Sequence, residues 1–378
     1  MINKNRLIKT LRKLISLDSQ NPPGDESRIA GFVAEYLRDL GLTVQIYRFK
    51  SKRDNVIARL EGQSPKTLLI TPHLDTVPVG KSWREDPFAG KICGDKIYGL
   101  GATDCKGNLA CALEAITSLV EDGMKLSYNL LFAATADEES GSALGLIPLL
   151  ERKILKADAA VVLDADDFEI VVTQKGLMHL KVCIFGKKAH GAYPWLGINA
   201  IDIAAAIITD LKKQKIEYKK NKYLRQPTLN VGTIKGGDKV NVVSDWCECE
   251  LDFRFLPGTS EKQILLNLKR TISRYSRNFK IEIQGIQNPY SINPQHPLVK
   301  CLASAMCKVK VKPQLSGSEG ATVITFFKAR NIPALATGFG KEGCAHIADE
   351  YAQVSNLYKG SKVLVEFLKD YKFSHSCK

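Results

Sequence analysis

Three short apolar segments, each followed by charged side chains, constrain the fold of this chain more than any other sequence feature. They span residues 67–71 (TLLIT), 129–135 (NLLFAAT) and 159–163 (AAVVL), and such short apolar runs are consistent with strands buried in a sheet. In open α/β sheets, ligands bind outside the carboxyl ends of the strands. The chain therefore predicts one shared polar site where these strands end. The side chains that follow the segments are His73 and Asp75, then Asp137, Glu138 and Glu139, and finally Asp164.

The order of the expected elements indicates an α/β fold with a smaller inserted domain. Residues 26–40 and 106–120 read as helices that alternate with the apolar strands. From Thr173 to about Tyr290 the expected order is strand, helix, strand, strand, helix, strand, which is typical of an α+β sandwich. Alternation then resumes and ends in an amphipathic helix at 354–369. We expect a mixed sheet flanked by helices from residues 1–173 and 291–378, and an inserted α+β (ferredoxin-like) domain at 174–290.

The composition is that of an ordinary globular protein, with 44% hydrophobic and 25% charged residues among 378. The first 17 residues are amphipathic and lack the continuous apolar core of a secretory signal, and no apolar run reaches the length of a membrane span. The ten cysteines, from Cys93 to Cys377, form no CxxC pair and are interpreted as reduced thiols. We therefore expect a cytoplasmic protein with no membrane partner.

The net charge of +14 is partly local, because residues 212–225 contain seven basic side chains and one acidic side chain. One interpretation is a nucleic-acid-binding patch on which Tyr218 and Tyr223 stack bases. The other is a solvated helix end and loop, with the tyrosines packed on the domain. We favour the second interpretation and expect no nucleic-acid partner.

Imidazoles and carboxylates are numerous enough for a centre of two divalent metals. Both groups suit zinc and similar cations, and a pair of ions needs a bridging carboxylate with about two further ligands for each ion. His73 and Asp75 lie on the same side of an extended segment, which suits Asp75 to orient the imidazole. The neighbours Glu138 and Glu139 diverge, so one can bind metal while the other stays free as a general base. The candidates are His73, Asp75, Asp104, Glu138, Glu139, Asp164 and His346.

Segments along nearly the whole chain resemble, in order, the motifs of one enzyme family. The family comprises zinc aminoacylases, acetylornithine deacetylases, succinyl-diaminopimelate desuccinylases and glutamate carboxypeptidases. It implies a phosphorylase/hydrolase-like α/β catalytic domain and an inserted lid and dimerisation domain. The matching segments are 73–78 (HLDTVP), 83–88 (WREDPF), 99–107 (GLGATDCKG), 137–141 (DEESG), Asp164, 189–194 (AHGAYP), 241–243 (NVV), 252–254 (DFR), 345–346 (AH) and 349–351 (DEY).

The resemblance implies a role for each metal-site candidate. Asp104 resembles the carboxylate that bridges two zinc ions, with cobalt or manganese as alternatives, and the peptide bond after it is implied to be cis. One ion is implied to be bound by His73 and Asp164, and the other by Glu139 and His346. By the same resemblance, Glu138 is the base that activates water, Asp75 orients His73, and His190 contacts the substrate oxyanion, often across a homodimer interface.

Three further residues are candidates for substrate binding, each with a structural alternative or a departure from the family. Arg254 has the geometry to bind a substrate carboxylate or to pair with Asp252 on the same sheet face. Asn241 is a hydrogen-bonding or a turn residue. Ser318 lies in a glycine-rich loop resembling the substrate loop of the family, although Thr322 aligns where some members have arginine.

A second departure from the family is Cys105, where methionine is more usual. Cys105 is either an oxidation-sensitive thiol or, as we favour, a buried inert one.

The implied reaction is hydrolysis of the amide bond of an N-acyl amino acid, of the acetylornithine deacetylase or succinyl-diaminopimelate desuccinylase type. A dipeptidase or carboxypeptidase with the same two-metal chemistry is the alternative, with a short peptide as substrate. A non-catalytic or nucleic-acid-binding protein is the competing class. It predicts salt-sensitive binding of nucleic acid and no hydrolysis that a chelator abolishes.

Overall fold

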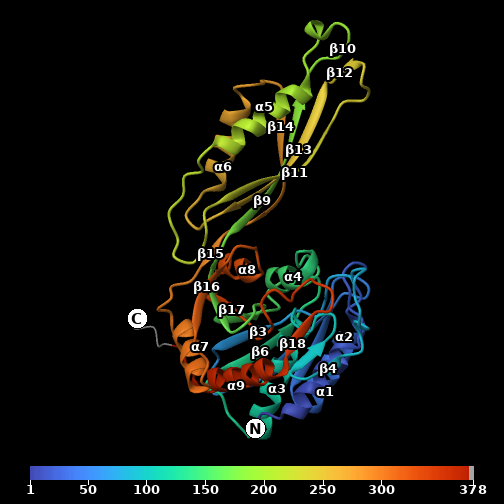
Figure 1. Cartoon of the computed structure of the whole chain (residues 1–378). Helices are drawn as coiled ribbons and strands as arrows, with labels where there is room; N and C mark the ends of the chain where they lie inside the picture. Colours follow the sequence, from blue (N-terminus) through green and yellow to red (C-terminus); the bar gives the residue numbers. More distant parts are fainter. Residues whose placement is uncertain (374–378) are drawn as a thin grey trace. The chain divides into compact units, whose positions relative to one another are not determined.

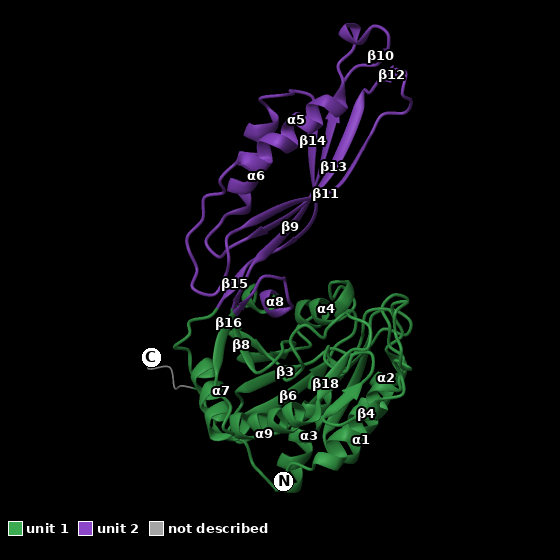
Figure 2. Cartoon of the chain, in the orientation of Figure 1, with its two compact units in different colours: residues 1–172, 292–316, 326–378 green, residues 173–291, 317–325 purple. Residues whose placement is uncertain are grey.

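The computed structural model describes residues 1–373, and the chain folds into two compact units (Figures 1 and 2). Unit 1 contains residues 1–172, 292–316 and the chain from residue 326 onward. Unit 2 contains residues 173–291 and 317–325. The second unit is therefore formed by two segments of the chain, which divide the first unit into three.

Unit 1 is built on a mixed sheet in which the strand order brings the three sequence-predicted strand ends together. Strands β6, β3, β7 and β17 lie side by side and run parallel, while β1, β2 and β8 are antiparallel to their neighbours. Because β3 lies between β6 and β7, their carboxyl ends meet at one edge. The order is β1 (Thr43–Arg48), β2 (Asp54–Leu60), β6 (Asn129–Ala134), β3 (Thr67–Thr71), β7 (Ala159–Leu163), β17 (Ala334–Thr337), β8 (Glu169–Gln174) and β15 (Tyr290–Ser291), with β16 (Gln314–Ser318) paired to β8.

Helices flank this sheet, so the predicted α/β class is confirmed. Helix α3 is almost entirely buried, and both α1 and α9 pack against it. Helix α1 is amphipathic as predicted, since it buries Leu7, Leu11 and Leu14. Its lysines and Arg12 are exposed, whereas Arg6 pairs with the buried Glu114 of α3. A three-stranded sheet is formed by β4 (Lys91–Cys93), β5 (Lys96–Tyr98) and β18 (Tyr351–Gln353). The helices are α1 (Lys4–Ile15), α2 (Ser27–Asp39), α3 (Lys106–Glu121), α4 (Leu146–Glu151), α7 (Pro297–Lys308), α8 (Ile324–Lys328), α9 (Val354–Asp370) and the 3-10 turn η1 (Glu138–Ser140).

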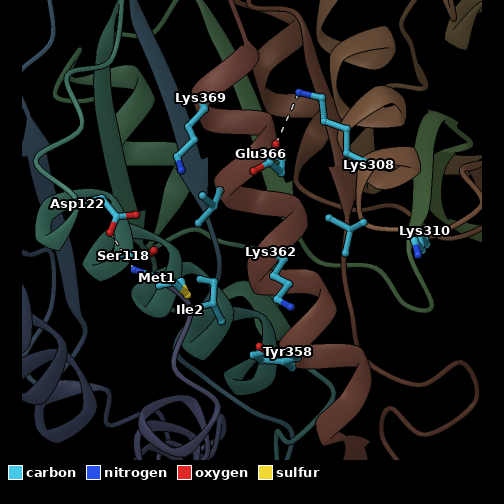
Figure 3. Close-up of a pocket in the computed structure, with 12 residues that line it drawn as sticks. Met1, Ile2, Ser118, Asp122, Lys308, Lys310, Tyr358, Lys362, Glu366 and Lys369 are labelled. Atoms are coloured by element: carbon cyan, nitrogen blue, oxygen red, sulfur yellow. Dashed lines mark hydrogen bonds and ion pairs between the residues drawn. The ribbon is translucent and has the colours of Figure 1, made fainter.

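A hollow of about 640 Å³ on unit 1 lies where the N-terminus meets α3, α7 and α9 (Figure 3). Two of the cationic groups that line it form ion pairs. Lys308 lies 2.5 Å from Asp370, and the α-amino group of Met1 lies 3.0 Å from Asp122. Water and salt screen exposed ion pairs of this kind, so they add little to stability. The hollow thus lies where helix ends meet, and none of the metal-ligand candidates lines it.

Unit 2 is a four-stranded antiparallel sheet with two helices, as the sequence predicts. The sheet order is β11–β13–β9–β14, and a two-stranded sheet of β10 and β12 extends the unit. Alternate residues of β13, from Cys247 to Phe255, are buried in one core with side chains of both helices. The elements are β9 (Gly176–Phe185), β10 (Ala189–His190), η2 (Pro194–Leu196), α5 (Ala200–Lys213), β11 (Thr228–Gly236), β12 (Val242–Val243), β13 (Trp246–Phe255), α6 (Glu261–Ile272) and β14 (Phe279–Gln287).

Two features of the described chain bear on its environment. Within residues 1–373, no helix combines the length and the apolarity needed to cross a bilayer. The nine cysteines in that range are free thiols, as the sequence analysis expects, whereas Cys377 lies outside the described residues.

Candidate metal centre

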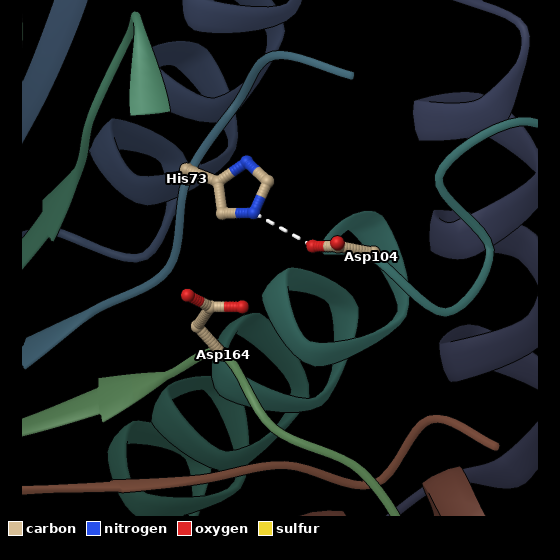
Figure 4. A group of neighbouring side chains, drawn as sticks. All are labelled: His73, Asp104 and Asp164. Carbon is tan, nitrogen blue, oxygen red and sulfur yellow. Dashed lines mark hydrogen bonds and ion pairs between the residues drawn. The ribbon is translucent and has the colours of Figure 1, made fainter. Parts of the chain in front are cut away.

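His73 leaves the end of strand β3 and is almost fully buried at the edge of the sheet (Figure 4). Its Nδ1 atom lies 3.0 Å from the backbone carbonyl oxygen of Asp75 and 3.6 Å from the carboxylate of the same residue. Its Nε2 atom lies 2.8 Å from Oδ1 of Asp104. Asp75 therefore holds one ring nitrogen of His73, and the other ring nitrogen faces the carboxylate of Asp104.

The carboxylate of Asp75 also fixes the segment that carries the two glutamates. It accepts hydrogen bonds from the backbone N–H groups of Glu138 at 3.0 Å and Glu139 at 3.1 Å. The side-chain amide of Asn21 donates a third hydrogen bond at 2.9 Å. Asp75 thus positions the imidazole of His73 and the backbone of the 138–139 pair at the same time.

Asp104 lies at the start of helix α3 and contacts two histidines through its two oxygens. Oδ1 faces His73, as above, and Oδ2 lies 3.2 Å from Nε2 of His346. The peptide bond from Asp104 to Cys105 is cis, as the resemblance implies. A carboxylate whose oxygens point at two separate imidazoles has the arrangement that a bridging ligand requires.

The loop before Asp104 is held by a carboxylate that the sequence analysis gave no role. Glu350 is 1% exposed and accepts hydrogen bonds from the backbone N–H groups of Gly101 and Thr103, each at 2.8 Å, and of Asp104 at 3.0 Å. Gly101 has a φ of +80°, which only glycine adopts readily. Glu350 lies four residues after His346, so one short segment supplies both a candidate ligand and the support of another.

The candidate ligands form two groups that share Asp104. The first is His73, Asp104 and Asp164, and the second is Asp104, Glu139 and His346. Within each group the donor atoms lie within 4.8 Å of one another. Three carboxylates and two imidazoles are the donors that zinc and similar cations prefer. The donor set therefore fits two divalent cations bridged by Asp104.

The electrostatics of the cluster also favour cations. Burial, followed by repulsion from Asp104, raises the pKa of Asp164 to about 7. Burial and repulsion from Asp164 likewise raise the pKa of Glu138 well above its usual 4.5. Hydrogen bonds to Asp104 and Glu139 raise the pKa of His346 to about 10. Carboxylates that repel one another this strongly gain stability when positive charge is placed between them.

Glu138 belongs to neither ligand group, although its neighbour Glu139 does. The two residues form the turn η1, which follows Asp137 in a left-handed conformation with a φ of 65°. Glu139 lies 3.2 Å from Nε2 of His346, whereas Glu138 is part of neither ligand group. The division of roles expected for the two glutamates stays a prediction.

A buried polar network behind this turn was missed by the sequence analysis. Arg53 lies 2.8 Å from both Glu26 and Asp137, and all three side chains are at most 7% exposed. The Arg53 guanidinium also donates to Asn21, whose amide reaches Asp75. The partners come from segments far apart in the chain, and nothing in the local sequence of Glu26 or Arg53 marks them.

The remaining candidates all lie in unit 2. His190 of β10 and Asn241, which precedes β12, are brought together, since Gly191 donates its N–H to the Asn241 carbonyl at 2.8 Å. Arg254 of β13 makes a two-point ion pair with Asp252, at 2.8 and 3.1 Å, which is the structural alternative weighed from the sequence. Ser318 ends β16 on a different part of the unit, and its hydroxyl donates to the Gly320 carbonyl at 3.2 Å.

Cys105, the departure next to the bridging aspartate, is an enclosed thiol. It is fully buried and donates a hydrogen bond to the Leu163 carbonyl at 2.9 Å. Burial raises its pKa to about 11. A thiol with this pKa contains little of the thiolate that oxidants attack, which favours the inert interpretation.

Comparison with known proteins identifies the family. Residues 69–370 match the Peptidase family M20/M25/M40. An acetylornithine deacetylase of Vibrio atlanticus (strain LGP32) is 28% identical over 371 residues, covering 95% of this chain and 96% of its own. Among solved structures, an M20 family metallo-carboxypeptidase from Sulfolobus solfataricus has a TM-score of 0.80 at 25% identity, covering 97% of this chain and 99% of its own. A tripeptidase from Staphylococcus aureus has a TM-score of 0.82 at 25% identity, covering 98% of both chains. The chain thus belongs to Peptidase family M20/M25/M40 and is a metal-dependent hydrolase of amide bonds.

Proposed function

We propose that the chain hydrolyses the amide bond of N-acyl amino acids at a centre of two divalent ions, with zinc as the preferred metal. The observation that carries this proposal is the pair of ligand groups that share Asp104, with Glu138 beside them and outside both. The proposed ligands are His73 and Asp164 for one ion, Glu139 and His346 for the other, and Asp104 between them.

The proposed mechanism assigns catalytic and positioning roles to residues of this chain. Two ions bound there would polarise the scissile carbonyl and lower the pKa of the attacking water. Glu138 takes a proton from that water and delivers it to the leaving amine. Asp75 keeps both His73 and the backbone of Glu138 in place through its hydrogen bonds. His190, an exposed residue of β10, donates a hydrogen bond to the oxygen of the reacting carbonyl.

One relative supports N-acyl amino acids as the substrate class, and short peptides are the alternative. The acetylornithine deacetylase that matches 95% of this chain favours an N-acetyl amino acid, and an N-succinyl amino acid is the variant of the same reaction. The solved carboxypeptidase and tripeptidase, both 25% identical, favour a peptidase as the second candidate. For either substrate, Asn241 and Ser318 are the proposed polar contacts, and Arg254 would have to exchange Asp252 for the substrate carboxylate.

One set of assays distinguishes an N-acyl amino acid hydrolase from a peptidase and also tests Glu138 as the general base. Enzyme stripped by a chelator and reloaded with zinc, cobalt or manganese is assayed with N-acetyl amino acids, N-succinyl amino acids, dipeptides and tripeptides. We expect chelation to abolish hydrolysis and an acylated amino acid to be the best substrate. Glu138→Gln should retain bound metal and lose nearly all turnover, whereas the exposed control Glu35→Gln should match the wild type. Near-normal turnover by Glu138→Gln would overturn the assignment of the base.

We also propose that two chains associate through unit 2. Large apolar side chains are exposed around β10 and β12, and Trp195 is the clearest, with 74% of its surface exposed. Contiguous apolar surface of this kind marks sites of protein association. The other exposed side chains there are Tyr193, Leu196, Ile198 and Val240.

The free thiols among the described cysteines support a cytoplasmic location. We do not propose that the basic stretch 212–225 binds nucleic acid.

A further inference from the structure

Unit 2 contains a cavity of about 670 Å³ that no step of amide hydrolysis uses. It lies beside the sheet between α5, α6 and the segment 214–219 that follows α5, all within the purple unit of Figure 2. A volume of this size falls in the range of small-molecule sites, roughly 300–1,000 Å³. The cavity is thus large enough for a ligand and is formed within one compact unit.

The interior of the cavity is apolar. Side chains from three strands and both helices contribute to it, and most of them also belong to the hydrophobic core of unit 2. A surface of this composition favours a hydrocarbon group, because removing apolar area from water is favourable. The apolar residues that matter most are Leu180, Leu211, Leu251, Phe253, Ile264 and Leu268.

The border of the cavity carries a net positive charge. Lys215 and Lys219 line it, and within residues 1–373 neither lysine takes part in an ion pair. Glu217 also lines it and offsets one of these charges. The lysines belong to the stretch 212–225, whose seven basic side chains and single acidic one make the local field positive. The border is therefore suited to an anionic group attached to an apolar body.

We propose that this cavity binds a small anionic amphiphile, an aliphatic carboxylate whose chain lies on the leucine-rich interior and whose carboxylate faces Lys215 and Lys219. This gives a function to the basic stretch that the hydrolase activity leaves unexplained. The cavity shares no residue with the candidate metal centre, because every residue that lines it belongs to unit 2 and every candidate metal ligand belongs to unit 1.

Calorimetric titration of the full chain with decanoate tests the proposal directly. Decyltrimethylammonium, which has the same alkyl chain and the opposite charge, is the comparator. We expect saturable binding of one decanoate per chain, with an affinity at least about tenfold above that for the cation, which corresponds to about 1.4 kcal/mol. Absence of saturable decanoate binding, or equal affinity for the two probes, would overturn the proposal.

Two pairs of variants locate the binding. Lys215→Glu/Lys219→Glu should weaken decanoate binding at least about tenfold, since two favourable charges become unfavourable. Lys220→Glu/Lys222→Glu changes the net charge equally at residues that do not line the cavity, and should leave the affinity nearly unchanged. Equal losses in the two double variants would show a diffuse charge effect and overturn the proposed carboxylate site.

The second pair tests the apolar interior. Gln263 is an exposed residue of α6 that lines the cavity, so Gln263→Trp places an indole at the cavity without removing a core side chain. It should abolish decanoate binding and leave the midpoint of thermal unfolding near that of wild type. The neighbouring exposed control, Lys262→Trp, should bind normally. Undiminished binding by a folded Gln263→Trp would place the ligand elsewhere and contradict the proposal, whatever the outcome of the hydrolysis assays.

Discussion

Glu350 offers a quantitative test of how the bridging aspartate is positioned. Its carboxylate accepts three backbone N–H groups from the loop 101–104, at 2.8, 2.8 and 3.0 Å, and it is 1% exposed. Oε1 accepts from Thr103 and Asp104, and Oε2 accepts from Gly101. Both oxygens are therefore occupied, and the loop depends on both.

In Glu350→Gln, one oxygen is replaced by an amide NH₂ group, so at least one buried N–H faces another donor. Leaving one such group without an acceptor costs about 1–3 kcal/mol. If this cost falls on the metal-bound state, the affinity for metal drops about 5- to 150-fold. That range overlaps the loss of roughly 10–100-fold that is typical when a residue supporting a metal ligand is removed.

The assay is competition between the protein and a chromophoric chelator for zinc, with kcat/KM measured on the same samples. The control is Glu342→Gln, an exposed glutamate near His346 that does not contact the loop. We expect Glu350→Gln to lose metal affinity and the control to keep it. Metal affinity and kcat/KM that match the wild type in Glu350→Gln would refute the role of this carboxylate.

Two further predictions concern stability and assembly. Arg53→Met leaves two buried carboxylates without their cation, and should lower the free energy of unfolding by about 3–5 kcal/mol, measured by urea denaturation. The exposed pair of Arg59 with Glu61 provides the control, since Arg59→Met should cost less than about 1 kcal/mol, and equal costs would contradict the argument. Trp195→Glu should reduce the mass in sedimentation equilibrium from two chains to one, and an unchanged mass would exclude this surface as the interface.

Local sequence was sufficient to predict the strands that carry the site. The segments 67–71 and 159–163 coincide with β3 and β7, and β6 ends one residue before the predicted segment does. Each is a short apolar run bounded by polar or turn residues, so the sequence itself indicates where the strand begins and ends. The sequence did not specify β17, a four-residue strand that depends on pairing with β7 and β8.

Part of the candidate site could likewise be predicted from local sequence. Residues with metal-binding side chains could be found by type and position, and the structure brings the five proposed ligands into two groups around Asp104. Among the residues that support them, Asp75 could be found from its spacing to His73, whereas Arg53 and Glu350 could not. Arg53 meets Asp137 across 84 positions, and Glu350 meets Asp104 across 246. Such contacts depend on the complete fold and leave no local pattern. The roles of the five ligands and of Glu138 stay predictions.

For the basic stretch 212–225, composition leaves two interpretations open, and we favour a solvated helix end and loop. Lys212 and Lys213 end helix α5, where cations interact favourably with the helix dipole. Lys222 lies over the ring of Tyr223, at 5.4 Å from its centroid. The cavity beside residues 214–219 depends on packing between helices and sheet, which charge alone could not reveal.

The central claim, that Asp104 bridges two cations, is tested most directly by anomalous diffraction from crystals of the zinc-loaded protein. The account predicts two anomalous peaks about 3.5–4 Å apart, each within coordination distance of one oxygen of Asp104. One peak should also contact His73 and Asp164, and the other Glu139 and His346. A single peak, or two peaks of which one lies away from Asp104, would contradict it.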